Sequence, residues 1–570
     1  MIVLFLLVVL LLFVTAAVWA FGRIRRHDED GDGESALVRL ILLALLLSSS
    51  ILVTTGTAGL LERLFGVGSA LVRRGAGDLA RDLSFVVVGG LAAALLWAWT
   101  LSRLRRSPSE RRSLLWGAYV GTALTISLVV GAVHAITLLG DLIGPDVAAP
   151  ALHGSRVLAW GAFWGWHRRV WADPDTRPER IPNFAALVGS AFGLAAGATG
   201  VGIVLGELFG DAYRAATGTA IVRSGSSLDE GIAAAVVGAV VWIWHWWFSA
   251  RKLEQRGGWL VHTLGVGVLG GLVTVLVAAG SVLFAVLEWW FARPAGVGAA
   301  SHFEVVAGSS AAAVVGGAVW IYHRGVLRDP ERAYGTEPGR AYRYLQAGIG
   351  LVAAAAGLGV VVAAVFQGMA GPIAAAGGAV TTLLRGVTAV AVGVPLWVTT
   401  WRDVQRAVAA DPEAELTGTW RRVYLVAVFG AAGVAALVTL VVIAFRLFET
   451  ALEGASLSSF LDATSTAFGI LVASGTVAGY HLAIWRRDRA AGLRPRRRVA
   501  SVLLVAGPDD AALADTIRRA TGAKVIRYET DGVVQVPLSE IAEALQTIDG
   551  ERVLVVREGD RVRIVPYRPR

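Results

Sequence analysis

Residues 350–366 have the sequence GLVAAAAGLGVVVAAVF and contain no charged side chain. A helix needs about twenty such residues to cross a membrane, because the hydrocarbon layer is about 30 Å thick and each residue advances the helix by about 1.5 Å. Similar apolar runs recur along the chain, and residues 2–20 form the first of them. The stretch therefore predicts a membrane-spanning helix, and its recurrence predicts a protein with many of them.

The composition of the 570-residue chain agrees with lipid as its main solvent. The chain is 55% hydrophobic and only 17% charged, with a mean hydropathy of +0.62. One soluble core could not hide this much apolar surface from water. The absence of cysteine excludes disulfides, thiolate zinc sites, iron–sulfur clusters and a cysteine nucleophile.

Lysine and arginine predict the orientation in the membrane. The first apolar run has no basic residue before it and is followed by Arg23, Arg25 and Arg26, so we expect a retained helix that runs from outside to inside. Basic residues are about three times as frequent in the alternate loops that this orientation places inside, as the positive-inside rule requires. Membrane topology therefore explains the net charge of +9, and we expect no nucleic-acid partner.

After the lead helix, the chain repeats six times with a period near 79 residues, and each unit is a pair of membrane helices. The first helix of five units ends at an acidic residue. These acidic positions are Glu62, Asp141, Glu207, Glu288 and Glu449. The second helix ends in an aromatic-histidine pattern, often Trp-x-x-His. Its residues are Trp164, His167, Trp242, His245, Trp320, His323 and His481.

These patterns predict an all-α polytopic membrane bundle of about 13 transmembrane helices with six parallel two-helix repeats, followed by a small C-terminal α/β domain. The expected parts are a lead helix at 1–22, repeats at 36–105, 113–170, 183–252, 259–328, 341–406 and 421–490, and a cytoplasmic domain at 499–570. In the last domain, alternating apolar residues predict strands at 501–506, 523–528, 552–557 and 562–566, with helices at 511–521 and 539–549.

Three aromatic strings carry a resemblance to a known family. Residues 163–170 are FWGWHRRV, residues 241–252 are VWIWHWWFSARK, and residues 319–328 are VWIYHRGVLR. With the helix pairs and the basic inner loops, they resemble DUF5671, a bacterial transmembrane domain family of unknown function, in about six tandem copies. The resemblance implies a membrane fold and supplies no activity.

The four histidines at the predicted inner helix ends have two interpretations. Neutral imidazole can ligate haem iron or a metal, so facing rings could form a cofactor site. Tryptophan and histidine also favour the boundary between lipid and water, where the ring is half-buried and its polar atom is wet. We favour a boundary belt and predict no cofactor, with haem and metal left open.

The acidic positions would face the exterior in this topology. A ring of carboxylates could concentrate cations at a pore mouth, but a carboxylate just beyond an apolar run also marks the end of a helix, and we favour the marker. His134 lies seven residues before Asp141, near the same helical face, and could act in an intramembrane proton relay. Arg446 and Glu449 are three residues apart and predict an ion pair.

No motif in the chain names a substrate or a reaction, and an enzyme is disfavoured. We expect a non-enzymatic assembly or scaffold protein of the bacterial plasma membrane, with its N-terminus outside and a cytoplasmic domain at 499–570 that docks a protein partner. Small-residue strings such as 189–202 favour a tight bundle and further copies of the chain as partners, besides lipid. The alternatives are a permease or channel for a small solute or cation, and a haem- or quinone-binding redox subunit.

Overall fold

The computed structural model describes residues 33–66, 75–144, 149–218, 227–253, 257–292, 296–327, 337–370, 378–491, 501–506, 514, 517, 524–529, 552–558 and 561–566. The expected lead helix at 1–22 lies outside these residues. From 33 to 491 the described chain is almost entirely helical.

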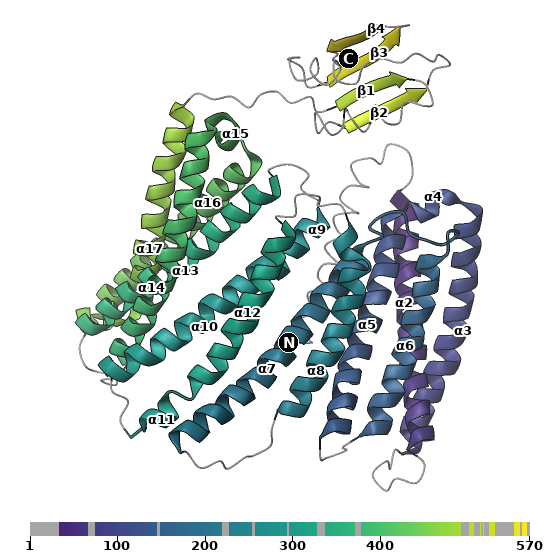
Figure 1. Cartoon of the computed structure of the whole chain (residues 1–570), viewed down its shortest axis with the longest axis horizontal. Helices are drawn as coiled ribbons and strands as arrows, with labels where there is room; N and C mark the ends of the chain where they lie inside the picture. Colours follow the sequence, from purple (N-terminus) through teal and green to yellow (C-terminus); the bar gives the residue numbers. More distant parts are fainter. Residues whose placement is uncertain are drawn as a thin grey trace. The chain divides into compact units, whose positions relative to one another are not determined.

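Long helices coincide with the apolar runs of the sequence (Figure 1). They are α2 (Gly33–Phe65), α3 (Ala76–Arg106), α5 (Leu114–Ile143), α6 (Pro150–Ala172), α7 (Phe184–Thr217), α8 (Leu228–Trp242), α10 (Gly270–Leu287), α12 (Val305–Leu327), α13 (Glu337–Ala370), α14 (Gly378–Ala410), α16 (Thr419–Glu453) and α17 (Leu457–Ala490). Shorter segments are α4 (Pro108–Arg111), α9 (Gly258–Leu260), α11 (Ala299–His302), α15 (Pro412–Leu416), a 3-10 turn η2 (Ala250–Lys252) and the π-helical η1 (Ile243–Trp247), η3 (Val261–Leu269) and η4 (Glu288–Ala292).

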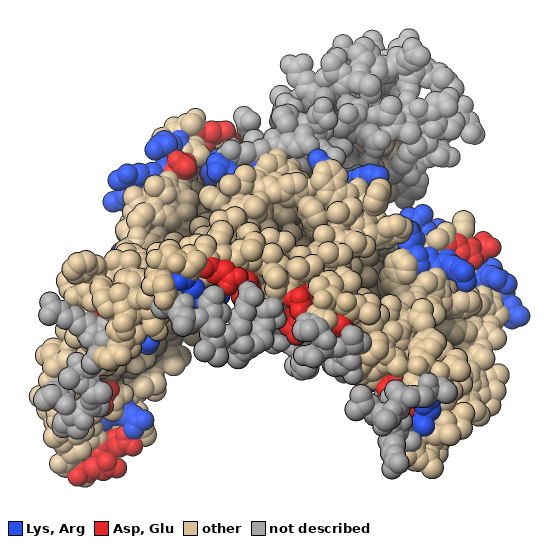
Figure 2. All heavy atoms as spheres, turned by 60° about the horizontal axis from the view of Figure 1, so that its bottom comes forward, with Lys and Arg blue, Asp and Glu red and all other residues tan. Residues whose placement is uncertain are grey.

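Eleven helical segments of the described chain are long and apolar enough to cross a membrane. The visible face in Figure 2 is mostly uncharged, with lysine and arginine confined to a few groups. The chain is therefore a multi-pass membrane protein. The expected count of thirteen is not reached, because the lead helix is not described and α6 is not among the eleven. Arg156, Arg168 and Arg169 make α6 more polar, although it still packs against α2 and α5.

The contacts divide the chain into two units, one of Met1–Trp401 with Ala435–Ser474, and one of Arg402–Val434 with Gly475–Arg570. Within the first unit, neighbouring helix pairs touch in chain order: α2 with α3, α5 with α6, α7 with α8, and α10 with α12. Contacts of α2 with α6, α5 with α8, and α7 with α12 join each pair to the next. These contacts form an array of helix pairs. The division of the chain into six repeats remains a prediction.

Glycine lets the two helices of a pair approach to backbone contact. A Cβ atom at Gly193 of α7 would collide with the backbone nitrogen of Trp242 in α8. The same contact joins Gly271 to Trp320 and Gly350 to Trp397. Small residues at such crossings are typical of membrane helices, where close van der Waals packing replaces the hydrophobic effect. The tryptophan of the repeated pattern therefore lies where its helix touches the first helix of the pair.

Four strands are described in the C-terminal region: β1 (Ser501–Ala506), β2 (Lys524–Glu529), β3 (Arg552–Glu558) and β4 (Arg561–Pro566). They form one sheet of order β2-β1-β3-β4, with β1 parallel to β2 and β3, and with β3 antiparallel to β4. The four predicted strands agree with these to within one or two residues. The predicted helices at 511–521 and 539–549 are not among the described elements, so the α/β class remains a prediction.

Candidate functional site

The four inner histidines lie inside the protein. His167, His323 and His481 have no exposed surface, and His245 is 8% exposed. In each, Nδ1 lies 2.8 or 2.9 Å from the carbonyl oxygen four residues earlier. A carbonyl only accepts, so Nδ1–H is the donor and Nε2 is left as an acceptor. The expected wet position is therefore wrong for these imidazoles. Trp164, Trp242 and Trp320 are half-buried, but the indole nitrogens of Trp242 and Trp320 are buried too.

In two helix pairs, a tyrosine of the first helix binds the histidine of the second. The hydroxyl of Tyr119 donates to Nε2 of His167 at 3.1 Å, and that of Tyr424 donates to Nε2 of His481 at 3.3 Å. These bonds connect α5 to α6 and α16 to α17. One ring nitrogen of each histidine therefore bonds a carbonyl of its own helix, and the other bonds the tyrosine of the partner helix.

In two of the three pairs between them, α7 with α8 and α10 with α12, a glycine lies against the imidazole. A Cβ atom at Gly189 would lie 2.6 Å from Cδ2 of His245, and one at Gly267 would collide with the ring of His323. The buried Nε2 of His323 has no hydrogen-bond partner within the described chain. The same part of the chain contains no group of three or more His, Cys, Asp or Glu that could hold a metal ion.

Replacing Tyr119 by phenylalanine should destabilise the protein by about 1–3 kcal/mol, because Nε2 of the buried His167 loses its donor. The free energy of unfolding in detergent measures this cost. A double-mutant cycle with His167→Phe provides the control, since the coupling should account for most of the loss. Additive effects of the two substitutions would show that the hydroxyl and the imidazole do not interact.

The predicted acidic positions have different surroundings. The Glu62 carboxylate is buried and lies 3.5 Å from the Arg156 guanidinium, whereas Glu288 is half-buried at the start of η4. One carboxylate oxygen of Asp141 is buried and has no hydrogen-bond partner among the described residues. Glu449 lies 2.7 Å from the exposed Arg446, so the predicted ion pair is confirmed. The acidic positions therefore differ in burial and in their partners, and they do not form a ring of equivalent carboxylates.

His134 has a partner that the sequence did not indicate. Its Nδ1 lies 2.9 Å from Nδ1 of His153 in α6, so one imidazole donates to the other. The prediction had paired His134 with Asp141 on its own helix. His153 and Arg156 both come from the weakly apolar helix α6, and only tertiary contact brings them to α5 and α2. The relay role of His134 remains a prediction.

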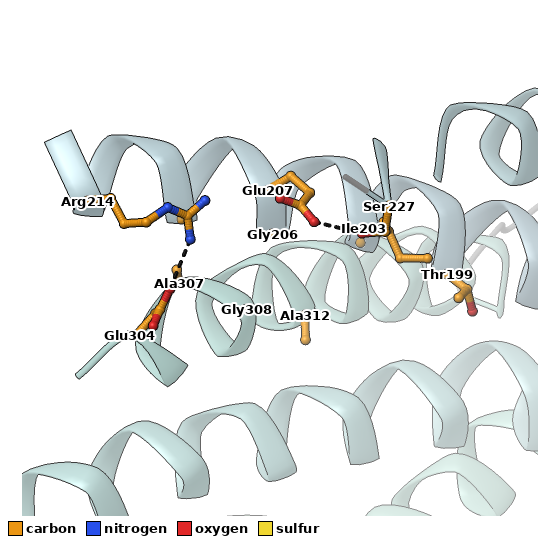
Figure 3. Close-up of a pocket in the computed structure, with 12 residues that line it drawn as sticks. Thr199, Ile203, Gly206, Glu207, Arg214, Ser227, Glu304, Ala307, Gly308 and Ala312 are labelled. Atoms are coloured by element: carbon orange, nitrogen blue, oxygen red, sulfur yellow. Dashed lines mark hydrogen bonds and ion pairs between the residues drawn. The ribbon is translucent and has the colours of Figure 1, made fainter. Parts of the chain in front are cut away.

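A cleft of about 410 Å³ lies between α7 and α12, along α7 from Thr199 to Arg214 (Figure 3). Glu207, one of the predicted acidic positions, lines it and accepts a hydrogen bond from the Ser227 hydroxyl at 2.7 Å. Arg214 binds Glu304 of the segment before α12 at 2.9 Å. The cleft unites residues from three parts of the sequence, of which only Glu207 was predicted.

Small side chains keep this cleft open. Gly202 and Gly206 of α7 and Gly308 of α12 line it, and a Cβ atom at Gly202 or Gly308 would meet no atom within 4 Å. The spacing of glycines at 202, 206 and 210 could have indicated a helix face of small residues. The sequence did not indicate the ion pair of Arg214 with Glu304. The two residues are 90 positions apart in the chain, and only the folded structure brings them together.

Comparison with known proteins identifies one family. The model of a domain of unknown function, DUF5671, matches residues 51–166, 180–295 and 340–476, which together make up more than half of the chain. There are three matches rather than six, and the first and third each span two helix pairs. No curated protein and no solved structure matches the chain.

Proposed function

Because this chain belongs to the DUF5671 family, whose domain has no known function, we propose that it is a non-enzymatic assembly protein of the membrane. The helix pairs form a packed array that presents apolar faces to lipid and to other chains, and residues 499–570 dock a cytoplasmic partner. The N-terminus is outside, and the membrane is the bacterial plasma membrane.

One observation carries this proposal: the repeated histidines take part in contacts that hold helix pairs together. In His167 and His481, Nδ1 bonds a carbonyl of the histidine's own helix and Nε2 accepts from a tyrosine of the other helix of the pair. A haem ligand would need a free imidazole nitrogen directed at the iron. Both nitrogens of His167 and His481 are already bonded, so these two histidines give the redox alternative less support than assembly, whereas Nε2 of His323 has no hydrogen-bond partner within the described chain.

The permease alternative also has less support. In the described spans, charged side chains lie within about three turns of a helix end, and Glu207 is the deepest. Ionisable groups near the middle of the membrane are the usual mark of an ion or proton pathway. Described spans without a carboxylate, lysine or arginine near the middle are better suited to packing than to conduction.

Purification of the full-length chain in a mild detergent tests the proposal. We expect a particle larger than one chain by light scattering, a spectrum without visible bands, and no stoichiometric metal. Removal of residues 499–570 should leave this particle intact while abolishing co-purification of a cytoplasmic protein that the full-length chain retains. A Soret band would favour the redox subunit. A monomer that carries solute flux lost in Glu207→Gln, with expression unchanged, would favour the permease.

A further inference from the structure

The cleft between α7 and α12 extends along one leaflet of the predicted membrane. Its lining runs from Thr199 to Arg214 of α7, which is about 22 Å of helix. Half of the hydrocarbon layer is about 15 Å thick, so this length covers one leaflet and its boundary. The end at Arg214 is the end that the charge distribution predicts to be outer.

The polar end of the cleft has an excess of negative charge among its described side chains. Arg214 lies 2.7 Å from Asp211 and 2.9 Å from Glu304, so its single positive charge faces two carboxylates. Glu207 adds a third carboxylate, which accepts a hydrogen bond from the neutral Ser227 hydroxyl. Figure 3 shows Glu207 on the same side of α7 as Arg214. This arrangement is complementary to a cation that can donate hydrogen bonds.

The other end of the cleft is open, and apart from Thr199 its lining is mainly small and apolar. Gly202, Ile203, Gly308 and Ala312 line it and leave room for a hydrocarbon chain. A second cleft of about 780 Å³ shares Glu304, Gly308 and Ala312 with the first, and both apolar residues such as Val273 and Val277 and polar residues such as Ser281 line it. A soluble cation would leave the apolar part of this lining without a partner.

We propose that this cleft binds a phospholipid whose headgroup carries a primary ammonium group. The ammonium donates to the Glu207 carboxylate, and one acyl chain lies along the Gly202 and Gly308 surface. An amphiphile fits both ends of the cleft. Its charged headgroup would lie beside the carboxylates, and its hydrocarbon chain would lie along the glycines, deeper in the membrane. Bulkier residues at the glycine positions would close the path of the chain.

Native mass spectrometry of the full-length protein tests this proposal with phosphatidylethanolamine, phosphatidylcholine and phosphatidylglycerol as probes. We expect the protein to retain phosphatidylethanolamine about fivefold more than the other two, as a single charged hydrogen bond allows. Glu207→Gln should remove this preference while leaving the fold intact, because the amide oxygen still accepts from Ser227. Gly202→Leu should reduce retention of all three lipids, because its side chain fills the open groove.

Glu449→Gln is the matched control, since it removes another predicted outer carboxylate that lies on α16 and does not line the cleft. Its lipid preference should equal that of the unmodified protein. Equal retention of the three lipids, or a preference that survives Glu207→Gln, would overturn the proposal. Displacement of phosphatidylethanolamine by millimolar ethanolamine would do so too, because it would show that the cleft takes a soluble amine without a hydrocarbon chain. Thermal midpoints of each variant verify that folding is unchanged.

Discussion

Replacement of Gly200 by valine should lower the free energy of unfolding by at least about 3 kcal/mol, the upper range for overpacking a well-packed site. Gly200 lies where α7 crosses α8, and a Cβ atom there would collide with the backbone nitrogen of Ala235 and lie 2.6 Å from the carbonyl oxygen of Gly231. Backbone atoms cannot rotate away as a side chain can. The two helices would have to separate, and the contacts along this crossing would be lost together. Unfolding in detergent, followed by the fluorescence of the tryptophans, measures the effect.

Gly202→Val is the matched control for this prediction. The same substitution two residues further along α7 places its Cβ atom where no other atom lies within 4 Å. Valine has a better helix propensity than glycine, so the control should change stability by less than about 1 kcal/mol. Equal losses at both positions would mean that the helix, and not the crossing, rejects valine, and the inferred close packing of α7 and α8 would then be wrong.

The helices themselves were predictable because lipid imposes a simple requirement on the sequence. A run such as 350–366 has no partner for its backbone except its own helix, and the structure places it inside α13. Helix lengths were less predictable. Long helices such as α7, with 34 residues, continue well beyond the apolar run into polar ends such as Asp211 and Arg214, where water and ion pairs support the backbone.

The partners between helices were not predictable from one sequence. The Trp-x-x-His spacing indicated a repeated position but not which atoms it faces. Tyr119 and Gly189 occupy corresponding places opposite His167 and His245, yet one donates a hydrogen bond and the other provides only space. A residue that matters because it is small leaves no chemical signal. The cleft was unpredictable for the same reason, because Glu304 meets Arg214 only after α12 packs on α7.

Replacement of Asp488 by asparagine should destabilise the second unit by about 3 kcal/mol, the usual cost of removing one partner from a buried ion pair. Arg421 at the start of α16 has a side chain only 3% exposed, and its guanidinium binds both carboxylate oxygens of Asp488 in α17 at 2.7 and 2.9 Å. The substitution keeps the size of the side chain but removes the negative charge that binds the buried guanidinium at two points. Water reaches too little of the guanidinium to replace the carboxylate.

Asp403→Asn separates burial from charge in this prediction. Asp403 binds Arg406 at 2.9 Å in the same unit, but the two side chains are 56% and 76% exposed. Solvent screens such a pair, so its loss should cost less than about 0.5 kcal/mol. Both variants remove one carboxylate charge, and comparison of their unfolding free energies therefore isolates the contribution of burial. If Asp488→Asn cost no more than Asp403→Asn, water would have to reach Arg421, and the close packing of α16 on α17 at this end would be contradicted.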